Sequence, residues 1–335
     1  MNSYERAMTR LAGQPVDRPP NFDIMMQFAA HCIGQPLARY YLDYRVLCAA
    51  NFAVQEAFDL DILQVISDPY REAADCGQPV EFPDDALPLW KGPFLAEPDD
   101  LRKLRPPKPE NGRRMSDRLA AVRHFREQAD GRVPIMGWVE GALAEAADLR
   151  GVSTLLIDLI DRPAWVHELL EICTEMAIAF ARAQIAAGAD IVGLGDAIAS
   201  QIAPKAYRQF ALPYEQRFFA AIRAAGAIPR LHICGNTSRI LADMAQSGAA
   251  IIDIDWMVDM RRAAELFGEI AVCGNFDPVA VMLNGTPEQV AAAATANMAA
   301  GGARSFSMAG CEIPDGTPHA NLRAQATALQ EWGGR

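Results

Sequence analysis

The sequence predicts an α/β protein whose parallel strands close into a barrel. After Gly112, short and almost wholly apolar strands alternate with amphipathic helices at least six times, a pattern typical of parallel strands buried on both faces. Nearly every strand is followed by a polar or glycine-containing segment. In a barrel these strand ends meet at one mouth, where active sites form. In the alternative, an open doubly wound sheet, they would spread along an edge.

The whole chain, residues 1–335, is expected to form one domain with two parts. Residues 1–110 are irregular, because prolines break the chain after a first amphipathic helix and again from residue 82 onward. Within them, 38–57 has helical spacing and 57–67 contains an apolar run expected to be a strand. This part is expected to be partly helical and to pack on the barrel, while residues 111–335 carry the regular repeats.

In residues 111–335 we expect helices and strands to alternate. Apolar residues recur three and four positions apart in each expected helix, and each expected strand is a short apolar run. Pro213 is expected to kink the helix that contains it. In chain order the expected elements are helix 114–130, strand 133–141, helix 164–187, strand 189–200, helix 204–225, strand 228–236, helix 238–247, strand 250–257, helix 260–267, strand 270–278, helix 287–300 and strand 303–316.

Composition and charge argue against several classes of protein. Hydrophobic residues make up 51% and charged residues 22% of the chain, which is ordinary for a globular protein with a sizeable core. A formal net charge of −11 repels phosphate backbones, so we expect no nucleic-acid partner. No apolar run reaches the ~18 residues that span a bilayer, and the N-terminus lacks an apolar signal core. The seven scattered cysteines are typical of reduced thiols in the cytoplasm.

The stretch LHICGN, residues 231–236, places a histidine and a cysteine two positions apart in one strand. His232 and Cys234 therefore share a face, about 6–7 Å apart along the strand, and imidazole and thiolate both suit Zn²⁺. A hydrogen-bonded histidine beside a buried cysteine is the simpler alternative. Cys311, after the last recognisable strand, would complete a catalytic zinc set with an open fourth position. Cys273 is the rival third ligand, although it lies within its strand.

Carboxylates follow several of the same strands. Glu140 and Asp196 each come directly after an apolar strand, where a solvated loop charge is the alternative. If they face a closed pocket, their pKa values rise and they can transfer protons. Asp253 and Asp255 alternate with isoleucine and share one face, which places them near the mouth. Glu140, Asp196 and Asp255 are the candidate catalytic residues, and Glu140 could also take the fourth zinc position when substrate is absent.

These residues, in this order, resemble the uroporphyrinogen decarboxylase superfamily, and more closely its methyltransferase branch. That branch includes methylcobamide:coenzyme M methyltransferases and corrinoid-dependent demethylases. The resemblance runs through 15–20, 196–214, 273–290 and 309–324. The His-x-Cys pair with a distant cysteine is specific to the methyltransferase branch, whereas the other motifs mark only the superfamily. The resemblance implies a (β/α)₈ TIM barrel with zinc held at its mouth by His232, Cys234 and Cys311.

The resemblance also implies a reaction and its partners. A methyl group would move between a small methylated substrate or thiol and a corrinoid such as methylcobalamin. No D-x-H-x-x-G corrinoid motif occurs in the chain, so the corrinoid is expected on a partner protein. The superfamily's decarboxylases also suggest a homodimer.

Two other functions are alternatives to methyl transfer. One is decarboxylation of a uroporphyrinogen-like substrate, and the other is a catalytically silent barrel that serves as a binding protein. Decarboxylases of the superfamily bind carboxylates with arginines in an early segment, and the matching residues 21–36 contain none. Because arginine is the chemical match for a carboxylate, the sequence argues against decarboxylation.

Overall fold

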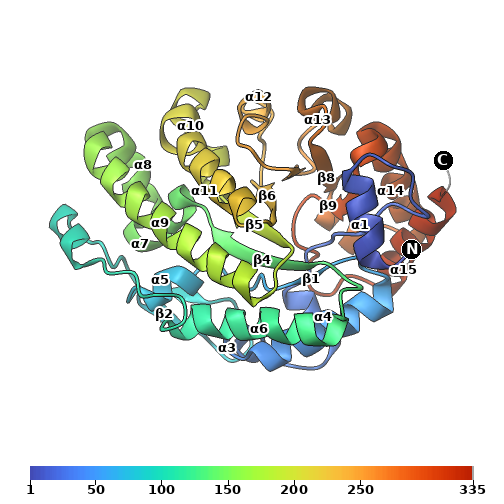
Figure 1. Ribbon diagram of the computed structural model, residues 1–335, viewed down its shortest axis with the longest axis horizontal. Helices are drawn as coiled ribbons and strands as arrows, with labels where there is room; N and C mark the ends of the chain where they lie inside the picture. Colours follow the sequence, from blue (N-terminus) through green and yellow to red (C-terminus); the bar gives the residue numbers. More distant parts are fainter. Residues whose placement is uncertain (334–335) are drawn as a thin grey trace.

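The computed structural model describes residues 1–333, in which a curled sheet of parallel strands is covered by helices on its outside (Figure 1). The seven strands of this sheet lie side by side in the same order as they occur in the sequence, β1-β4-β5-β6-β7-β8-β9. Such right-handed βα succession brings every carboxyl strand end to one mouth. The strands are β1 (Leu63–Gln64), β4 (Ile135–Glu140), β5 (Ile191–Gly195), β6 (Ile228–His232), β7 (Ile251–Asp253), β8 (Ala271–Phe276) and β9 (Phe306–Ala309).

Residues 20–22 fill the eighth position of the barrel, between its last strand and its first. Asn21 bridges Ser307 of β9, and the Phe22 N–H donates to the Ser307 carbonyl oxygen at 2.8 Å. On the other side, the Asp61 N–H donates to the Asn21 carbonyl oxygen at 2.8 Å, just before β1 begins. The expected (β/α)₈ barrel is therefore confirmed, and the first 110 residues supply two of its strand positions.

The helices follow the predicted order, and local signals explain where several begin. Asn2 and Glu5 form a capping box at the start of α1, and Thr286 and Gln289 form another at the start of α14; each satisfies backbone N–H groups that the first turn leaves unpaired. The helices are α1 (Ser3–Leu11), α2 (Gln27–Cys32), α3 (Leu37–Leu42), α4 (Tyr44–Phe58), α5 (Arg71–Asp75), α6 (Arg113–Ala129), α7 (Ala142–Arg150), α8 (Val152–Asp161), α9 (Pro163–Ala187), α10 (Pro204–Phe210), α11 (Leu212–Ala224), α12 (Leu241–Met244), α13 (Met260–Phe267), α14 (Pro287–Gly301) and α15 (His319–Trp332).

Three predicted helices differ from the observed ones. The helix expected at 204–225 is two helices, because Pro213 lies in the first turn of α11 and cannot donate to a continuous helix. The helix expected at 38–57 is interrupted at Asp43, which instead caps α4 by accepting a hydrogen bond from the Arg45 N–H at 3.1 Å. The helix expected at 238–247 shortens to the single turn α12.

Other elements lie in segments that the sequence pattern left unassigned. They include α2, α5, α7, α8 and α15, together with an antiparallel hairpin of β2 (Val80–Glu81) and β3 (Leu89–Trp90). Short turns of other helix types complete the connections: η1 (Pro98–Lys103), η2 (Ala197–Gln201), η3 (Pro278–Leu283) and η4 (Gly302–Arg304). None of the helices within residues 1–333 is both long enough and apolar enough to cross a bilayer.

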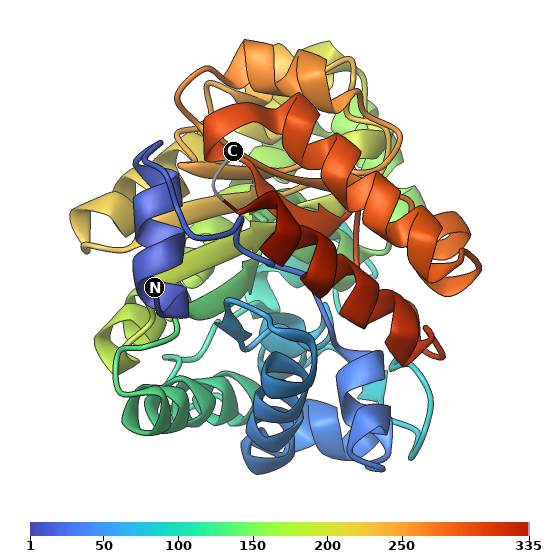
Figure 2. The same cartoon turned by 90° about the vertical axis from the view of Figure 1, so that its right-hand side faces the viewer.

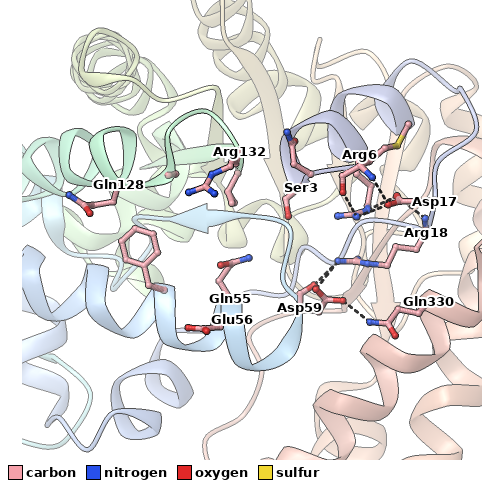
Figure 3. A pocket seen from close by; sticks show the side chains of 15 residues that line it. Ser3, Arg6, Asp17, Arg18, Gln55, Glu56, Asp59, Gln128, Arg132 and Gln330 are labelled. Carbon is pink, nitrogen blue, oxygen red and sulfur yellow. Dashed lines mark hydrogen bonds and ion pairs between the residues drawn. The ribbon is translucent and has the colours of Figure 1, made fainter.

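The helix α1 lies at the amino ends of the strands (Figure 2). The Tyr4 N–H donates to the Arg132 carbonyl oxygen just before β4, and the Arg10 Nε donates to the Ser305 carbonyl oxygen just before β9. A hollow of about 870 Å³ lies at this end (Figure 3). Arg6 binds both Asp17 oxygens, at 2.7 and 2.8 Å, and Asp61 at 2.6 Å, while Arg18 binds Asp61 at 2.6 Å. Since these charges are paired with one another, we assign the network to stability, in keeping with its place at the end of the barrel opposite the mouth.

Candidate metal centre

Three side chains from the carboxyl ends of two strands converge at the mouth. His232 ends β6, Cys234 lies two residues further on, and Cys311 lies two residues beyond β9. The His232 Nε2 is 2.9 Å from the Cys234 Sγ and 3.9 Å from the Cys311 Sγ, and the two sulfurs are 3.4 Å apart. All three donor atoms lie within 4.8 Å of one another. One imidazole and two thiols at this spacing fit a zinc ion with a position left for substrate.

Asp253 of β7 fixes the orientation of the histidine ring. Its Oδ2 lies 2.9 Å from the His232 Nδ1, so that the Nε2 faces the two sulfurs. The fully buried Arg230 of β6 donates its Nε to both Asp253 oxygens, at 2.9 and 3.1 Å. A carboxylate behind a ligating histidine sets the tautomer of the ring and raises its basicity. Asp253 is thus the residue that directs the His232 Nε2 toward the two sulfurs.

Cys273, the rival third ligand, lies in the barrel interior instead. It is fully buried, and its Sγ is 3.8 Å from the Arg230 Nη2 and 3.8 Å from the Met308 Sδ. Within residues 1–333 it does not join the three donor atoms at the mouth. Its position within β8, rather than beyond the strand end, is the reason.

The three donors have strongly shifted proton affinities. Hydrogen bonding from Cys234, assisted by His232, lowers the pKa of the Cys311 thiol to about 4 against the opposing effect of burial. The same contact, together with burial, raises the pKa of Cys234 well above its usual range. Burial opposes protonation of His232, yet its contacts with Asp253 and Cys311 raise its pKa to about 10. The cluster therefore favours a negative charge on the Cys311 sulfur, and the thiolate is the form of cysteine that binds metals.

A cavity of about 330 Å³ lies beside the three donors, and all three are part of its wall. The rest of the wall comes from both parts of the chain and is mainly apolar. A small molecule in this cavity would therefore reach the donor atoms while its body lies against apolar side chains. The main apolar contributors are Ile24, Met26, Ile66, Pro69, Leu87 and Trp138.

Glycines of β5 make room for the Trp138 indole at the cavity wall. A Cβ at Gly193 would lie 2.4 Å from the Trp138 ring, and a Cβ at Gly195 would lie 2.8 Å from it. The indole lies beside His232, with ring centroids 5.9 Å apart, and its Nε1–H donates to Glu140 at 3.1 Å. Gly193 and Gly195 therefore shape the site because they have no side chains to displace the indole.

Of the three candidate catalytic carboxylates, Glu140 lines the cavity. The Arg71 Nη2 donates to its Oε1 at 2.7 Å. Burial raises the pKa of Glu140 to about 7, although the charge of Arg71 acts in the opposite direction. A carboxyl group with this pKa can give or take a proton near neutral pH.

Asp196 and Asp255 are not among the residues that line the cavity. Asp196 is buried, its Oδ1 accepts a hydrogen bond from the Ala144 N–H at 3.0 Å, and burial raises its pKa to about 7. Asp255 accepts from the Gly235 and Trp256 N–H groups, both at 2.6 Å. The geometry of Asp255 fits a role in holding the turn that follows Cys234.

Sequence reasoning missed a group of buried acidic residues behind Glu140. The Glu72 Oε1 accepts from the Glu140 N–H at 3.0 Å. Both carboxyl oxygens of Glu145 are buried without a hydrogen-bond partner in the described chain. Burial, followed by the charges of Glu72 and Asp148, raises the pKa of Glu145 well above its usual range. The available signal was acidic residues in the otherwise apolar helix ALAEAADLR.

We expect Glu145→Gln to flatten the dependence of stability on pH. The folded protein keeps the Glu145 proton after the unfolded chain has lost it. This contribution to stability is therefore fully present below the unfolded pKa of about 4.3 and is lost as pH rises toward the raised folded pKa. Melting temperatures between about pH 5 and pH 8 should fall less in the variant than in the wild type. If the melting temperatures of the variant and the wild type change equally with pH, the prediction is wrong. Glu127→Gln, on the exposed face of α6, is the matched control.

The family described as "Uroporphyrinogen decarboxylase (URO-D)" matches residues 2–332. The chain belongs to this family. Within it, the chain is 34% identical to the methylcobamide:CoM methyltransferase MtbA of Methanosarcina mazei, over 70% of this chain and 68% of that protein. It is 27% identical to the uroporphyrinogen decarboxylase of Coxiella burnetii, over 98% of this chain and 95% of that protein. The solved structure of a methyltransferase from Methanosarcina mazei superimposes with a TM-score of 0.90 at 25% identity, covering 99% of both chains.

The comparisons confirm the resemblance drawn from the sequence motifs. Relatives within the uroporphyrinogen decarboxylase family carry the names of two kinds of enzyme, methyltransferases and decarboxylases. Membership therefore supports an enzyme but leaves two reactions to choose between. The choice depends on the chemistry of the cavity and of the three donors beside it.

Proposed function

We propose that the chain is a zinc-dependent methyltransferase. It would move a methyl group between a small methylated compound or thiol and a corrinoid carried by a separate protein. The observation that carries the proposal is the cluster of His232, Cys234 and Cys311 donor atoms within 4.8 Å at the wall of a cavity. The names of relatives such as the methylcobamide:CoM methyltransferase support it.

The residues of the site divide the work of such a reaction. When bound, zinc would supply Lewis acidity, which lowers the pKa of a ligating thiol or polarises a methyl-bearing atom. Cys234 and Cys311 would hold the ion, and Asp253 keeps the His232 Nε2 directed at the same point. Glu140 lines the cavity with a pKa of about 7, which suits its carboxyl oxygens to accept the proton that a substrate thiol releases.

Exposed apolar side chains around the mouth support docking of a corrinoid-carrying partner. Leu87, which lines the cavity, is 56% exposed, and Trp256, just beyond the end of β7, is 49% exposed. Large exposed apolar groups at the rim of a site are typical of a surface that another protein covers. A corrinoid delivered there would approach the cavity from its open side.

Decarboxylation of a polycarboxylate is the weaker alternative. In the part of the chain that the structure describes, no arginine or lysine lines the cavity beside the donors. Ile24, Met26 and Gln27, from the early segment that lacks arginine, form part of that wall. The carboxylates of a porphyrinogen would lose their hydration without gaining cationic partners, which is costly in a buried site.

The proposal predicts about one zinc per chain in protein purified without added metal, and transfer of methyl from methylcobalamin to a thiol. Elemental analysis would measure the zinc content. Loss of the methylcobalamin absorption would measure the methyl transfer. A fluorescence titration with a porphyrin should show no binding, since no arginine or lysine within residues 1–333 lines the cavity. A metal-free, folded protein that fails to demethylate methylcobalamin would contradict the proposal and favour a silent barrel. Tight porphyrin binding would favour the decarboxylase.

A further inference from the structure

We propose that the cavity selects against anionic substrates, so that the methylated compound or thiol it takes is uncharged or cationic. This inference rests on the proposed methyl transfer and narrows its substrate class. Coenzyme M, named for several relatives, is an anionic sulfonate, and a sulfonate would not suit the cavity of this chain. The argument depends on which charges reach the cavity wall and which are hidden behind it.

The charged groups on the cavity wall, apart from the metal donors, are all acidic. They are Asp68, Glu140 and Glu312. Neutral polar groups on the wall include Ser67, Gln27 and Tyr41. A sulfonate or carboxylate is recognised by arginine forks or lysines, and within residues 1–333 the wall offers neither.

Three arginines lie near this wall, yet all three are buried and none of them lines the cavity. Arg71 is 0% exposed and donates to Glu140 at 2.7 Å, and Arg114 is 5% exposed and pairs with Asp68 at 2.5 Å. Arg118 is also 0% exposed, and its Nη2 pairs with Asp117 and contacts the Tyr41 carbonyl oxygen. Each of these cations lies on the protein side of the groups that line the cavity. They neutralise the wall without presenting a positive surface to a ligand.

Glu312 places a further acidic group at the wall, again without an arginine or lysine beside it on that wall. It follows Cys311 directly, and its Oε1 accepts a hydrogen bond from the Gln27 N–H at 2.9 Å. The ion pairs of the described chain do not include it. An anionic head group in this cavity would lie beside acidic groups and lose its hydration without gaining a cationic partner, which is costly in a poorly hydrated space.

The same wall favours a neutral or cationic methyl compound. Trp138, Met26 and Ile66 supply apolar and aromatic surface for a small body that carries methyl groups. A cation would gain from the carboxylates and from the indole face. A neutral compound would gain from apolar contact alone, at no cost in desolvated charge.

A matched series of thiols tests the inference. The probes are 2-mercaptoethanesulfonate, 2-mercaptoethanol and 2-mercaptoethylamine, which share the HS–CH₂–CH₂ unit and carry a negative, a neutral and a positive group. Binding to the Co²⁺-substituted full chain is followed by the change in its visible absorption, independently of any methyl transfer. We expect the sulfonate to bind at least about tenfold more weakly than either of the others. Equal or tighter binding of the sulfonate, or binding of none of the three, would overturn the inference.

A variant with an added cation at the cavity wall tests whether sulfonate binding can be gained. Met26→Arg puts a cation on the wall, in the segment where decarboxylases of the family carry arginines, and it should improve sulfonate binding at least about fivefold relative to the amine. Met26→Gln, polar but uncharged, is the matched control and should not. If folded Met26→Arg leaves the preference unchanged, charge is not the cause and the inference fails. If Met26→Arg does not fold, the wild-type comparison decides alone.

These outcomes are separable from failure of the proposed function. Absence of metal binding or of methyl transfer would sink the proposed methyltransferase. Preference for the sulfonate in a protein that binds metal and transfers methyl groups would sink only the substrate class.

Discussion

Cys234→Ser and Cys311→Ser should each lose bound zinc and, with it, methyl transfer. A hydroxyl oxygen is a poor ligand where the site provides soft sulfur donors, and each variant leaves two protein ligands where three are needed to hold the ion. We expect metal content to fall from about one zinc per chain to near zero after dialysis, while far-ultraviolet circular dichroism stays unchanged. Transfer from methylcobalamin should fall in parallel with the metal.

Two other cysteines provide matched controls. Cys32 is only partly buried, and Cys273 lies in the barrel interior away from the three donors. Cys32→Ser and Cys273→Ala should keep about one zinc per chain, although Cys273→Ala removes buried volume and should lower the melting temperature. Retention of full zinc by both Cys234→Ser and Cys311→Ser would remove the basis of the proposed metal centre.

Asp253→Asn should weaken metal binding by about 10–100-fold, because the asparagine no longer provides the negative charge that orients and polarises His232. It should also cost about 3–5 kcal/mol of stability, since Arg230 is fully buried and its guanidinium would lose its charge partner. Metal affinity is measured by competition with a chromophoric chelator, and stability by urea unfolding of the metal-free protein.

A double variant separates these two effects. Adding Arg230→Met to Asp253→Asn removes the unpaired buried cation and should recover much of the lost stability. Metal affinity should stay low, because His232 still lacks its carboxylate. If the double variant regains both stability and metal affinity, Asp253 acts only through folding and is not a positioning residue.

The barrel and the convergence of the three donors were predictable from the sequence for one physical reason. In parallel βα repeats every carboxyl strand end meets at the same mouth. Residues at or just beyond the strand ends, such as His232, Cys234 and Cys311, are therefore neighbours whatever their separation in the chain. The same rule distinguished Cys311 from Cys273, which lies inside its strand.

Features that depend on non-local pairing could not be predicted in this way. Residues 20–22 have a strand position only because β9 and the segment before β1 offer hydrogen bonds on either side. Arg71 and Glu72 gain their place behind Glu140 from a short helix in a segment without clear periodicity. Asp253 was placed near the mouth by its alternation with isoleucine, but its bond to His232 required the register of β6 against β7.

The central claim is that His232, Cys234 and Cys311 together hold one zinc ion. X-ray absorption at the zinc edge, on protein purified without added metal, tests it most directly. The account predicts two sulfur neighbours at about 2.3 Å and a nitrogen neighbour at about 2.0–2.1 Å, with one lighter atom completing the shell. A zinc shell of nitrogen and oxygen alone would contradict it, as would protein that carries no metal after expression in zinc-containing medium.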